Sequence, residues 1–499
     1  MQPLPHVHLC IVQPKGDVHP LGFIDPARYF RWQFRRLGAQ VTIGKNRLRH
    51  DAVNFVFGSH LGFDPALRQR YATILVQLEQ LGLGGRPVPE QYLQLLRSSA
   101  VVDYDAGNVA AYAADPPAVP IAPFLHAPYL APAPGGIPIE RRPIDLLFFG
   151  SMNERRRRII QRIESTGLSV SQFDHPLFGP ERDTFIRQAK AVLNCHFYET
   201  TRFEQARASQ CLSLGTPLIS ERAPSTRPHP AFEDAVFWFD DASIESFFSR
   251  TFATPGFADA ARRKLAAFAH SDSRETYADL LRLAAEFHQR HRGERDPAPW
   301  RPARINLGSG KDYMPGWLNI DVQANAQPDL LLDLATAPAL PIRARGDLAG
   351  DVLLEASSAE CIYANNVLEH VPDLPAMMSR CLGLLKTGGT LIAEVPHERA
   401  RTAWQDPTHV RAFNENSWIY YTEWFWYLGW FEHRFEIAKL EYLDGRVRPC
   451  AAASAEFMRV YLRKIETTPR ERMTARMQRA DFCLDDDQVE ASPVALAAA

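Results

Sequence analysis

A glycine-rich loop and an acidic residue in the last third of the sequence have the types and spacing of a nucleotide-binding site. The apolar segment 305–307 leads into Gly308-Ser309-Gly310, and Asp321 ends the next apolar segment. Glycine lets a ligand approach the backbone closely, because it carries no Cβ and tolerates positive φ. The acid is placed to accept hydrogen bonds from two ribose hydroxyls, and it has little evident structural purpose. We therefore predict that Leu307 to Gly310 and Asp321 hold a nucleotide cofactor.

The spacing within this pattern argues against a dinucleotide cofactor. In NAD-binding units the acid lies about 20 residues beyond the motif GxGxxG, whereas here Asp321 follows Gly310 more closely and the motif is incomplete. Later residues fit S-adenosylmethionine (SAM) better. Asp333 is placed to meet an adenine amino group, with a capping or solvated acid as the alternative. Asn365 and Asn366 follow a predicted strand at the height of the cofactor's amino-acid end.

Several segments of this region occur in a defined order, namely LGSG, ID, DL, NNVLEHVPD and LLKTGGTLIAEVP. In that order they resemble the class I SAM-dependent methyltransferases over about residues 305–396. The resemblance implies a Rossmann-like domain, SAM as the cofactor and methyl transfer as the activity.

Methyl transfer to a hydroxyl requires an aligned acceptor and a base that removes the hydroxyl proton. Segment 406–413, DPTHVRAF, resembles a segment that faces the acceptor in many such methyltransferases. Its histidine, His409, is the predicted base, since imidazole titrates near neutrality, and a core or surface histidine is the alternative. The aromatic-rich segment 418–430 is predicted either to stack on sugar faces or to pack as a helical lid.

A second set of candidate ligands lies where an apolar strand is predicted to end in glycine. Gly150, Ser151, Asn153 and Arg155 come at the start of a basic helix. Backbone N–H groups and a guanidinium group at such a position would hold a diphosphate. The arginines at positions 156–158 are each expected to lie on a solvated helix face.

Segments between residues 9 and 248 resemble the two-domain (GT-B) glycosyltransferases of the CgeB-like type. The resemblance rests on residues 75–81, 102–105, 148–156, 193–199 and 203–219. It implies a nucleotide-sugar donor, with Glu204 near a helix start to bind the ribose. Gln210 departs from the family, because a glutamate usually stands there, so Glu204 replaces that acid or donor binding is altered. His19, in the loop after the first strand, is the candidate catalytic residue, with a structural role as the alternative.

The elements that position these residues are short apolar runs alternating with longer amphipathic runs, which predict α/β domains. We expect two tandem Rossmann-like domains in the GT-B arrangement, followed by a Rossmann-like domain of the methyltransferase type. The predicted strands are 7–12, 40–43, 54–58, 73–77 and 100–103, then 144–150, 191–196 and 218–221, then 305–307, 317–320, 329–334, 361–364 and 390–395.

Shifts in composition predict the domain boundaries. The predicted domains are 1–138, 139–290 and 304–465, with a linker at 291–303 and a flexible tail at 466–499. The Pro/Ala-rich stretch 114–138 is also expected to be a linker or a frayed segment.

Composition limits the classes of partner. The 56 basic and 58 acidic residues give a net charge of -2, so no nucleic-acid partner is expected. Seven cysteines without a CxxC pair indicate neither a disulfide framework nor a zinc site, and no metal is predicted. No apolar stretch reaches the roughly 18 residues of a membrane span, so we expect a cytoplasmic protein in which peripheral membrane association stays open. The oligomeric state is left open.

These observations predict a bifunctional enzyme of glycan or glycoconjugate biosynthesis. It would combine SAM-dependent methyl transfer, to a sugar acceptor, with glycosyl transfer from a nucleotide sugar. One alternative keeps the methyltransferase and makes the N-terminal pair of domains a catalytically silent glycan-binding module. Another is methylation of a protein or a small metabolite.

Overall fold

A computed structural model describes residues 4–114, 118–132, 135–173 and 175–478. The chain divides into two compact units, Met1–Arg295 and Asp296–Ala499. Six cysteines are free, and Cys483 lies outside the described residues. Within the described ranges no helix has both the length and the apolar composition that crossing a bilayer requires.

The first unit begins with a five-stranded parallel sheet of order β2-β1-β3-β4-β5. Three of its strands, β1, β3 and β4, are buried along their whole length, as parallel strands covered on both faces must be. The bounds are β1 Val7–Ile11, β2 Val41–Lys45, β3 Val53–Phe57, β4 Thr73–Gln77 and β5 Ala100–Asp103. All five predicted strands of this sheet are therefore present.

A second parallel sheet in the same unit has the order β10-β9-β8-β6-β7. Counted within each sheet, both orders are 2-1-3-4-5, the flavodoxin-like pattern, in which ligands bind beyond the strand ends where the winding reverses. In the second sheet that point lies between β6 and β8. The bounds are β6 Ile144–Leu147, β7 Val170–Ser171, β8 Ala189–Asn194, β9 Leu218–Glu221 and β10 Phe237–Phe239.

Helices connect the strands of this unit. In α1, Ala27, Phe30 and Phe34 are buried at helical spacing, which places one apolar face on the first sheet. The longer helices are α1 Ile24–Arg36, α2 Glu90–Arg97, α4 Glu154–Glu164, α5 Gly179–Gln188, α6 Gln205–Ser213, α9 Gly256–Ala269 and α10 Arg274–Glu294; the short ones are α3 Ala106–Val109, α7 Pro230–Glu233 and α8 Ile244–Phe247.

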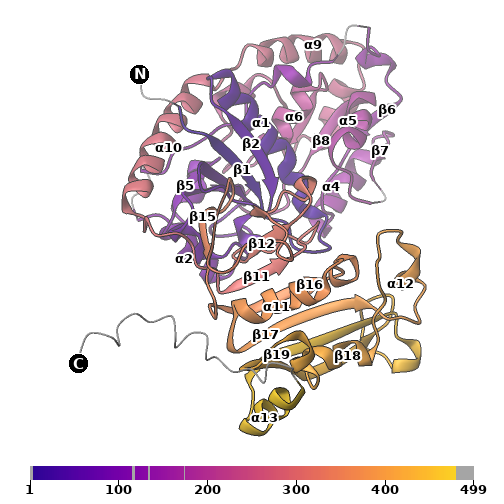
Figure 1. Cartoon of the computed structure of the whole chain (residues 1–499). Helices are drawn as coiled ribbons and strands as arrows, with labels where there is room; N and C mark the ends of the chain where they lie inside the picture. Colours follow the sequence, from indigo (N-terminus) through magenta and orange to yellow (C-terminus); the bar gives the residue numbers. More distant parts are fainter. Residues whose placement is uncertain (1–3, 115–117, 133–134, 174, 479–499) are drawn as a thin grey trace. The chain divides into compact units, whose positions relative to one another are not determined.

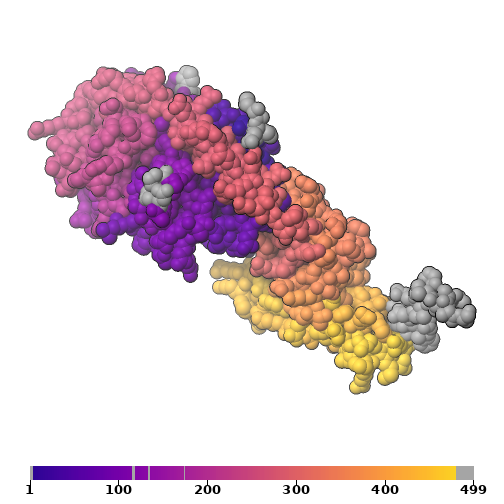
Figure 2. Space-filling view, turned by 90° about the vertical axis from the view of Figure 1, so that its left-hand side faces the viewer, coloured from indigo at the N-terminus to yellow at the C-terminus, as the bar shows by residue number. Residues whose placement is uncertain are grey.

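Helix α10 follows the second sheet in sequence but packs against the first. Tyr277 of α10 is buried, with its ring 5.0 Å from that of Phe30 and 5.8 Å from that of Phe34. Figure 1 shows α10 along the side of the N-terminal sheet, and in Figure 2 the salmon-coloured surface of this part of the chain borders the indigo surface of the N-terminal part. A domain of residues 139–290 would therefore share its last helix with the first domain, because this helix covers apolar residues of α1.

The Pro/Ala-rich stretch after β5 is not a loose linker in its described part. Phe124, Leu125 and Ala127 are buried in the hydrophobic core of the unit, and Ile121 bridges to Asp103. The expectation of a frayed segment was wrong there, since proline and alanine are compatible with a chain that crosses between two sheets and buries its apolar residues.

The second unit contains a seven-stranded sheet of order β13-β12-β11-β16-β17-β19-β18. The first five strands are parallel, and β19 is antiparallel to both β17 and β18. This order is that of a doubly wound Rossmann sheet in which one antiparallel strand, β19, is inserted between β17 and the edge strand β18. The bounds are β11 Arg304–Leu307, β12 Leu318–Asp321, β13 Leu330–Leu331, β16 Ala359–Asn365, β17 Leu385–Pro396, β18 His433–Leu443 and β19 Phe457–Glu466.

Other elements of this unit depart from prediction. The predicted strand 329–334 shortens to β13, and a hairpin of β14 Ile342–Gly346 and β15 Gly350–Leu354 follows it. The helices of this unit include α11, Leu374–Leu384, and the short α12, Thr402–Gln405. The expected tail begins as helix α13, Pro469–Gln478, which Glu471 ties to Arg434 by an ion pair. Residues 479–499 lie outside the described residues.

Candidate active sites

The glycine loop of the second unit follows β11 and requires glycine at its first position. Gly308 has a φ of 63°, and a Cβ built on it would lie 2.3 Å from Cγ2 of Val367. The loop therefore packs directly against the segment that follows β16. Leu307 is buried in the core of the unit, so only its backbone stays a candidate cofactor contact.

The strand register brings several predicted cofactor residues to one edge of this sheet. Leu307 pairs with Ile320 on one side and with Ala364 on the other. The next residue on each strand, respectively Gly308, Asp321 and Asn365, therefore stands at the same carboxyl edge. This is the edge at which doubly wound sheets bind ligands.

Asp321 is part of the loop's own structure. It is buried, and its Oδ2 accepts the N–H of Gly310 at 2.7 Å while its Oδ1 accepts the N–H of Gln323 at 2.8 Å. The expectation that this acid has little structural purpose was wrong. Each carboxylate oxygen keeps a second acceptor site, so ribose binding by Asp321 stays a prediction.

The remaining predicted cofactor residues make local contacts. Asp333 accepts the N–H of Ala335 at 2.9 Å, the geometry of the capping alternative. Asn366 has a φ of 51°, and its Nδ2 donates to Oδ1 of Asn365 at 3.0 Å. Ser309 is buried, and its hydroxyl finds no hydrogen-bond partner among the described residues. Cofactor binding by these residues stays a prediction.

Three polar residues that sequence reasoning missed hold the loop between β11 and β12. Oδ1 of Asn319 accepts from Nδ2 of Asn306 at 2.9 Å and from the N–H of Met314 at 2.8 Å. Asp329 accepts both the backbone and the side-chain N–H of Asn319 at 2.8 Å. The sequence signal that could have revealed them is one asparagine inside each of two apolar strands, Asn306 in β11 and Asn319 in β12.

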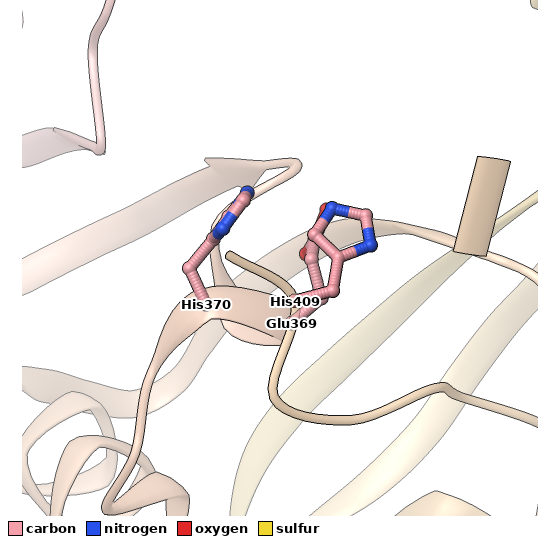
Figure 3. A group of neighbouring side chains, drawn as sticks. All are labelled: Glu369, His370 and His409. Atoms are coloured by element: carbon pink, nitrogen blue, oxygen red, sulfur yellow. The ribbon is translucent and has the colours of Figure 1, made fainter. Parts of the chain in front are cut away.

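The predicted base His409 lies in a group with Glu369 and His370, as Figure 3 shows. The rings of His370 and His409 meet edge to face with centroids 4.6 Å apart. Glu369 belongs to a short 3-10 turn, Leu368–His370, directly after β16, and its carbonyl accepts the N–H of Val410 at 2.9 Å. Burial raises the pKa of the Glu369 carboxyl to about 7. Glu369 and His370 lie within the segment NNVLEHVPD, and neither residue was given a role in the predicted site.

The aromatic segment after His409 divides between the two predicted alternatives. Trp418 and Phe425 are buried, and Trp418 stacks on Phe413 with centroids 5.3 Å apart. A second group remains exposed and forms edge-to-face contacts with itself. We call this group the aromatic patch; it consists of Tyr420, Trp424 and Tyr427.

The first unit contains a cavity of about 690 Å³ that both of its sheets line. It lies beyond the carboxyl end of β6 in the second sheet, next to the reversal of winding. Predicted residues His19, Gly150 and Ser151 line it. Charged residues of the lining that sequence reasoning missed are Asp25, Glu79, Arg182 and Arg207.

Two predicted diphosphate ligands are engaged elsewhere. Asn153 caps α4 by accepting the N–H of Arg156 at 2.9 Å, and its Nδ2 donates to the carbonyl of Phe197 at 3.0 Å. The Arg155 guanidinium donates to both carboxylate oxygens of Glu221. Neither side chain lines the cavity, and local helix and strand contacts engage both, so diphosphate binding by these two residues stays a prediction.

Arginines from other helices take their place at the cavity. Arg207 of α6 approaches Gly150, where a Cβ would lie 3.0 Å from its Nη2, and Gly150 has a φ of 134°. Arg182 of α5 forms ion pairs with Asp25 at 2.8 Å and with Asp183 at 2.5 Å. Two arginine side chains, Arg182 and Arg207, thus line the cavity, and each forms an ion pair with a carboxylate.

Glu204 and Arg156 belong to one network of ion pairs. Glu204 accepts from Arg156 at 3.0 Å and from Arg207 at 2.5 Å, and it lines a smaller cavity of about 270 Å³. Arg156 is only 2% exposed and also donates to the carbonyl of Cys195, so the expected solvated face was wrong for this residue. Arg157 and Arg158 are exposed, as expected.

The family departure at Gln210 has a structural counterpart. Gln210 is buried, and its Nε2 donates to both carboxylate oxygens of Asp183, at 3.2 and 3.1 Å. An acid therefore stands beside the amide, supplied by α5 rather than by α6. At the other side of the cavity Glu79 pairs with His60 at 3.3 Å and with Arg86 at 2.8 Å.

Comparison with known proteins adds a family for one part of the chain. Residues 269–483 match a family described as a methyltransferase domain. Uncharacterized protein L140 of Acanthamoeba polyphaga mimivirus is 25% identical over 225 residues, covering 40% of this chain and 71% of that protein. Uncharacterized protein L138 of the same virus is 35% identical over 78 residues, which are 15% of this chain and only 9% of L138.

Among solved structures, AviGT4, a glycosyltransferase involved in avilamycin A biosynthesis, is 14% identical, with a TM-score of 0.38. The similarity covers 58% of this chain and 99% of AviGT4. In the second unit, the family match and the Rossmann-like sheet with its glycine loop fall on the same residues. The C-terminal part of this chain therefore matches the methyltransferase domain family on a Rossmann-like sheet with a glycine loop, and two further Rossmann-like sheets precede it in the sequence.

Proposed function

We propose that the chain transfers a methyl group from SAM to a hydroxyl of a sugar, and that its N-terminal unit transfers a glycosyl group from a nucleotide sugar. The observation that carries the methyl-transfer proposal is the shared carboxyl edge of β11, β12 and β16. Gly308, Asp321 and Asn365 stand there together, and His409 is tied to the loop after β16.

The chain's own residues would act on the acceptor as follows. Bound SAM would supply the methyl group: the acceptor oxygen would bond to the methyl carbon in line as the carbon–sulfur bond breaks, and the neutral thioether would leave. Nδ1 of His409 lies 2.9 Å from the carbonyl of Ala403, an acceptor, so Nδ1 carries the proton. Nε2 then has the free lone pair that takes the hydroxyl proton.

The aromatic patch supports a sugar as the acceptor. Tyr420, Trp424 and Tyr427 expose ring faces, and aromatic faces offer large apolar surfaces with polar edges nearby. Trp424→Ala should raise KM for a glycan acceptor while SAM affinity stays unchanged. An unchanged KM would argue for a protein or a small metabolite as the acceptor.

Glycosyl transfer is proposed for the 690 Å³ cavity of the first unit. Arg207 and the open backbone at Gly150 are suited to a diphosphate, because guanidinium groups bind phosphate oxygens in a bidentate manner. His19 and Glu79 line the same cavity and are the candidate bases. Glu204 stays the candidate for the ribose. Both proposed donors are intracellular metabolites, so we place the reactions in the cytoplasm.

One observation favours a silent glycan-binding module instead. Gln210 stands in place of an acid, and the neighbouring Asp183 is already paired with Arg182 and Gln210. Calorimetric titration with SAM and with a set of nucleotide sugars separates the two proposals. SAM binding with no response to any nucleotide sugar, together with methylated glycan detected by mass analysis, would select the silent module. No heat with SAM would contradict the methyl-transfer proposal.

A further inference from the structure

We propose that Glu369, His370 and His409 form a binding site for a divalent transition-metal ion such as Zn²⁺. Each residue offers one ligand atom, and these atoms all lie within 4.8 Å of one another. Two residues come from the turn after β16 and the third from the segment after α12, and the three side chains gather on one side of the backbone in Figure 3.

Both imidazoles are oriented with Nε2 available for a metal. Nδ1 of His409 must donate to the carbonyl of Ala403, 2.9 Å away, because a carbonyl only accepts. Nδ1 of His370 lies 2.9 Å from the Thr408 hydroxyl, which itself donates to Oδ1 of Asp406 at 2.6 Å. The Thr408 oxygen therefore accepts from His370, and in both rings the unprotonated nitrogen is Nε2.

This arrangement matches what surrounds metal-bound histidines. A ligating imidazole usually donates its other N–H to a backbone carbonyl or to a carboxylate, directly or through a bridging group. His409 has the carbonyl, and His370 has the carboxylate of Asp406 through Thr408.

The buried carboxylate of Glu369 independently indicates a cation site. Glu369 is only 1% exposed, and neither carboxylate oxygen accepts a hydrogen bond from another residue in the described ranges. Burial of a carboxylate without a partner is unfavourable, whereas metal coordination satisfies it. Protonation of the carboxyl or a bound dication can offset that cost, and the two imidazoles beside Glu369 supply the further ligands that a dication needs.

The ligand types select the class of ion. Imidazole nitrogen suits Zn²⁺, Fe²⁺ and related ions, whereas Mg²⁺ and Ca²⁺ prefer oxygen ligands. Two histidines and one carboxylate are three protein ligands, which leaves a position for water or for an acceptor hydroxyl. In the metal-bound form His409 is a ligand, and a coordinated hydroxyl loses its proton more readily than a free one. That last consequence rests on the proposed methyl transfer; metal binding itself does not.

The test measures binding without SAM or acceptor. The full chain is treated with a chelator and titrated with ZnCl₂ by calorimetry, and with CoCl₂ by visible absorption. We expect one equivalent of Zn²⁺ and a Co²⁺ spectrum of tetrahedral type. Glu369→Gln and His409→Asn should each weaken Zn²⁺ binding by at least about tenfold, since each removes a ligand. Unchanged affinity in both variants, or absence of binding by the wild type at millimolar Zn²⁺, would overturn the proposal.

Two further variants separate loss of the site from loss of the fold. Thr408→Val keeps all three ligands but removes the bridge from His370 to Asp406, and it should weaken Zn²⁺ binding by about 10-fold or more. His433→Asn removes a histidine of the same unit outside the group and should bind Zn²⁺ like the wild type. A loss in His433→Asn equal to that in His409→Asn would show adventitious histidine binding.

Thermal unfolding gives a second readout. Zn²⁺ should raise the Tm of the wild type, because a ligand that binds the folded state stabilises it. Glu369→Gln should raise the Tm of the metal-free chain, since a buried charge is removed, and abolish the Zn²⁺ response. Failure of SAM to bind would leave these results unaffected, so the metal proposal and the methyl-transfer proposal fail separately.

Discussion

Oδ2 of Asp321 accepts the backbone N–H of Gly310 at 2.7 Å, so the acid that ends β12 holds the glycine loop that follows β11. One carboxylate thereby links two adjacent strand ends at the proposed cofactor edge. Its effect on SAM binding has two parts, a direct contact and the shape of the loop.

Asp321→Asn tests both parts. A hydrogen bond to a charged group contributes roughly 1.5–3 kcal/mol, so SAM affinity should fall by about tenfold to a hundredfold. Calorimetry gives the affinity, and urea unfolding reports the stability of the loop's unit. Asp444→Asn, at the exposed turn after β18, is the matched control and should bind SAM normally. Normal SAM affinity in Asp321→Asn would remove this acid from the proposed site.

Gly308→Ala should destabilise the second unit through a steric clash and a strained backbone. The new Cβ would lie 2.3 Å from Cγ2 of Val367, at a φ of 63°. Gly388 has a φ of 83° and nothing within 4 Å of its Cβ position, so Gly388→Ala isolates the backbone cost of about 1–2 kcal/mol. Urea unfolding should show a larger loss for Gly308→Ala than for Gly388→Ala.

A double variant identifies the clash. Val367→Ala in the Gly308→Ala background should recover the steric part of the loss and leave the backbone part. If the double variant is as unstable as the sum of the two single variants, packing between these residues is not the cause.

Substitution of Arg207 and of Arg155 should have different effects on nucleotide binding. Arg207 lies beside Gly150 in space, whereas Arg155 is near it in sequence. Arg207 lines the cavity, so Arg207→Gln should weaken binding of a nucleoside diphosphate by about tenfold or more. Arg155 pairs with Glu221, so Arg155→Gln should lower the Tm and leave nucleotide affinity intact. Calorimetry with UDP and thermal unfolding measure the two effects. The reverse pattern would return Arg155 to the site.

The first unit should lose stability as the solution is acidified below about pH 6.5. The pKa of His8 is lowered to about 4, chiefly by burial. The hydrogen bond to the carbonyl of Arg47 and the charge of Asp51 oppose this shift, and the charges of Arg49 and His6 add to it. The unfolded chain, with an ordinary histidine pKa of about 6.5, binds the proton first. The free energy of unfolding therefore falls between pH 6.5 and 4, by up to about 3 kcal/mol from this residue.

His8→Gln keeps a donor for the carbonyl of Arg47 and removes the titration. The difference in unfolding free energy between wild type and His8→Gln should shrink on going from pH 7 to pH 5. A difference that is constant with pH would show that His8 is protonated in the folded state as well.

Strand prediction from the sequence succeeded where strands are buried on both faces. The strands β1, β3 and β4 are mostly apolar and are buried along their whole length, as is typical of parallel strands covered on both faces. The hairpin of β18 and β19 was missed, because antiparallel strands with one solvated face mix charged and apolar residues, as His433–Leu443 does. The proline and alanine content of stretch 114–138 was also misleading. It predicted a linker or a frayed segment, whereas segment 118–132 contains residues of the core.

The site residues divide in the same way. Gly308 and Asp321 were recognisable because backbone geometry and strand ends are local properties, and the loop needs glycine at a fixed position. Asn153 and Arg155 were assigned to a ligand although nearby partners use them. Whether an arginine faces a cavity or a carboxylate depends on α5, α6 and β9, which lie far away in sequence.

The sequence by itself determined three Rossmann-like sheets, the glycine loop with Asp321, and the methyltransferase family resemblance. These follow from local apolar patterns and from residue types at strand ends. Only the tertiary structure decided that Arg182 and Arg207 line the cavity, that Asp321 holds the loop, and that Glu369, His370 and His409 meet. The physical reason is that burial and partner choice are set by which distant strand ends the sheet register and helix packing bring together.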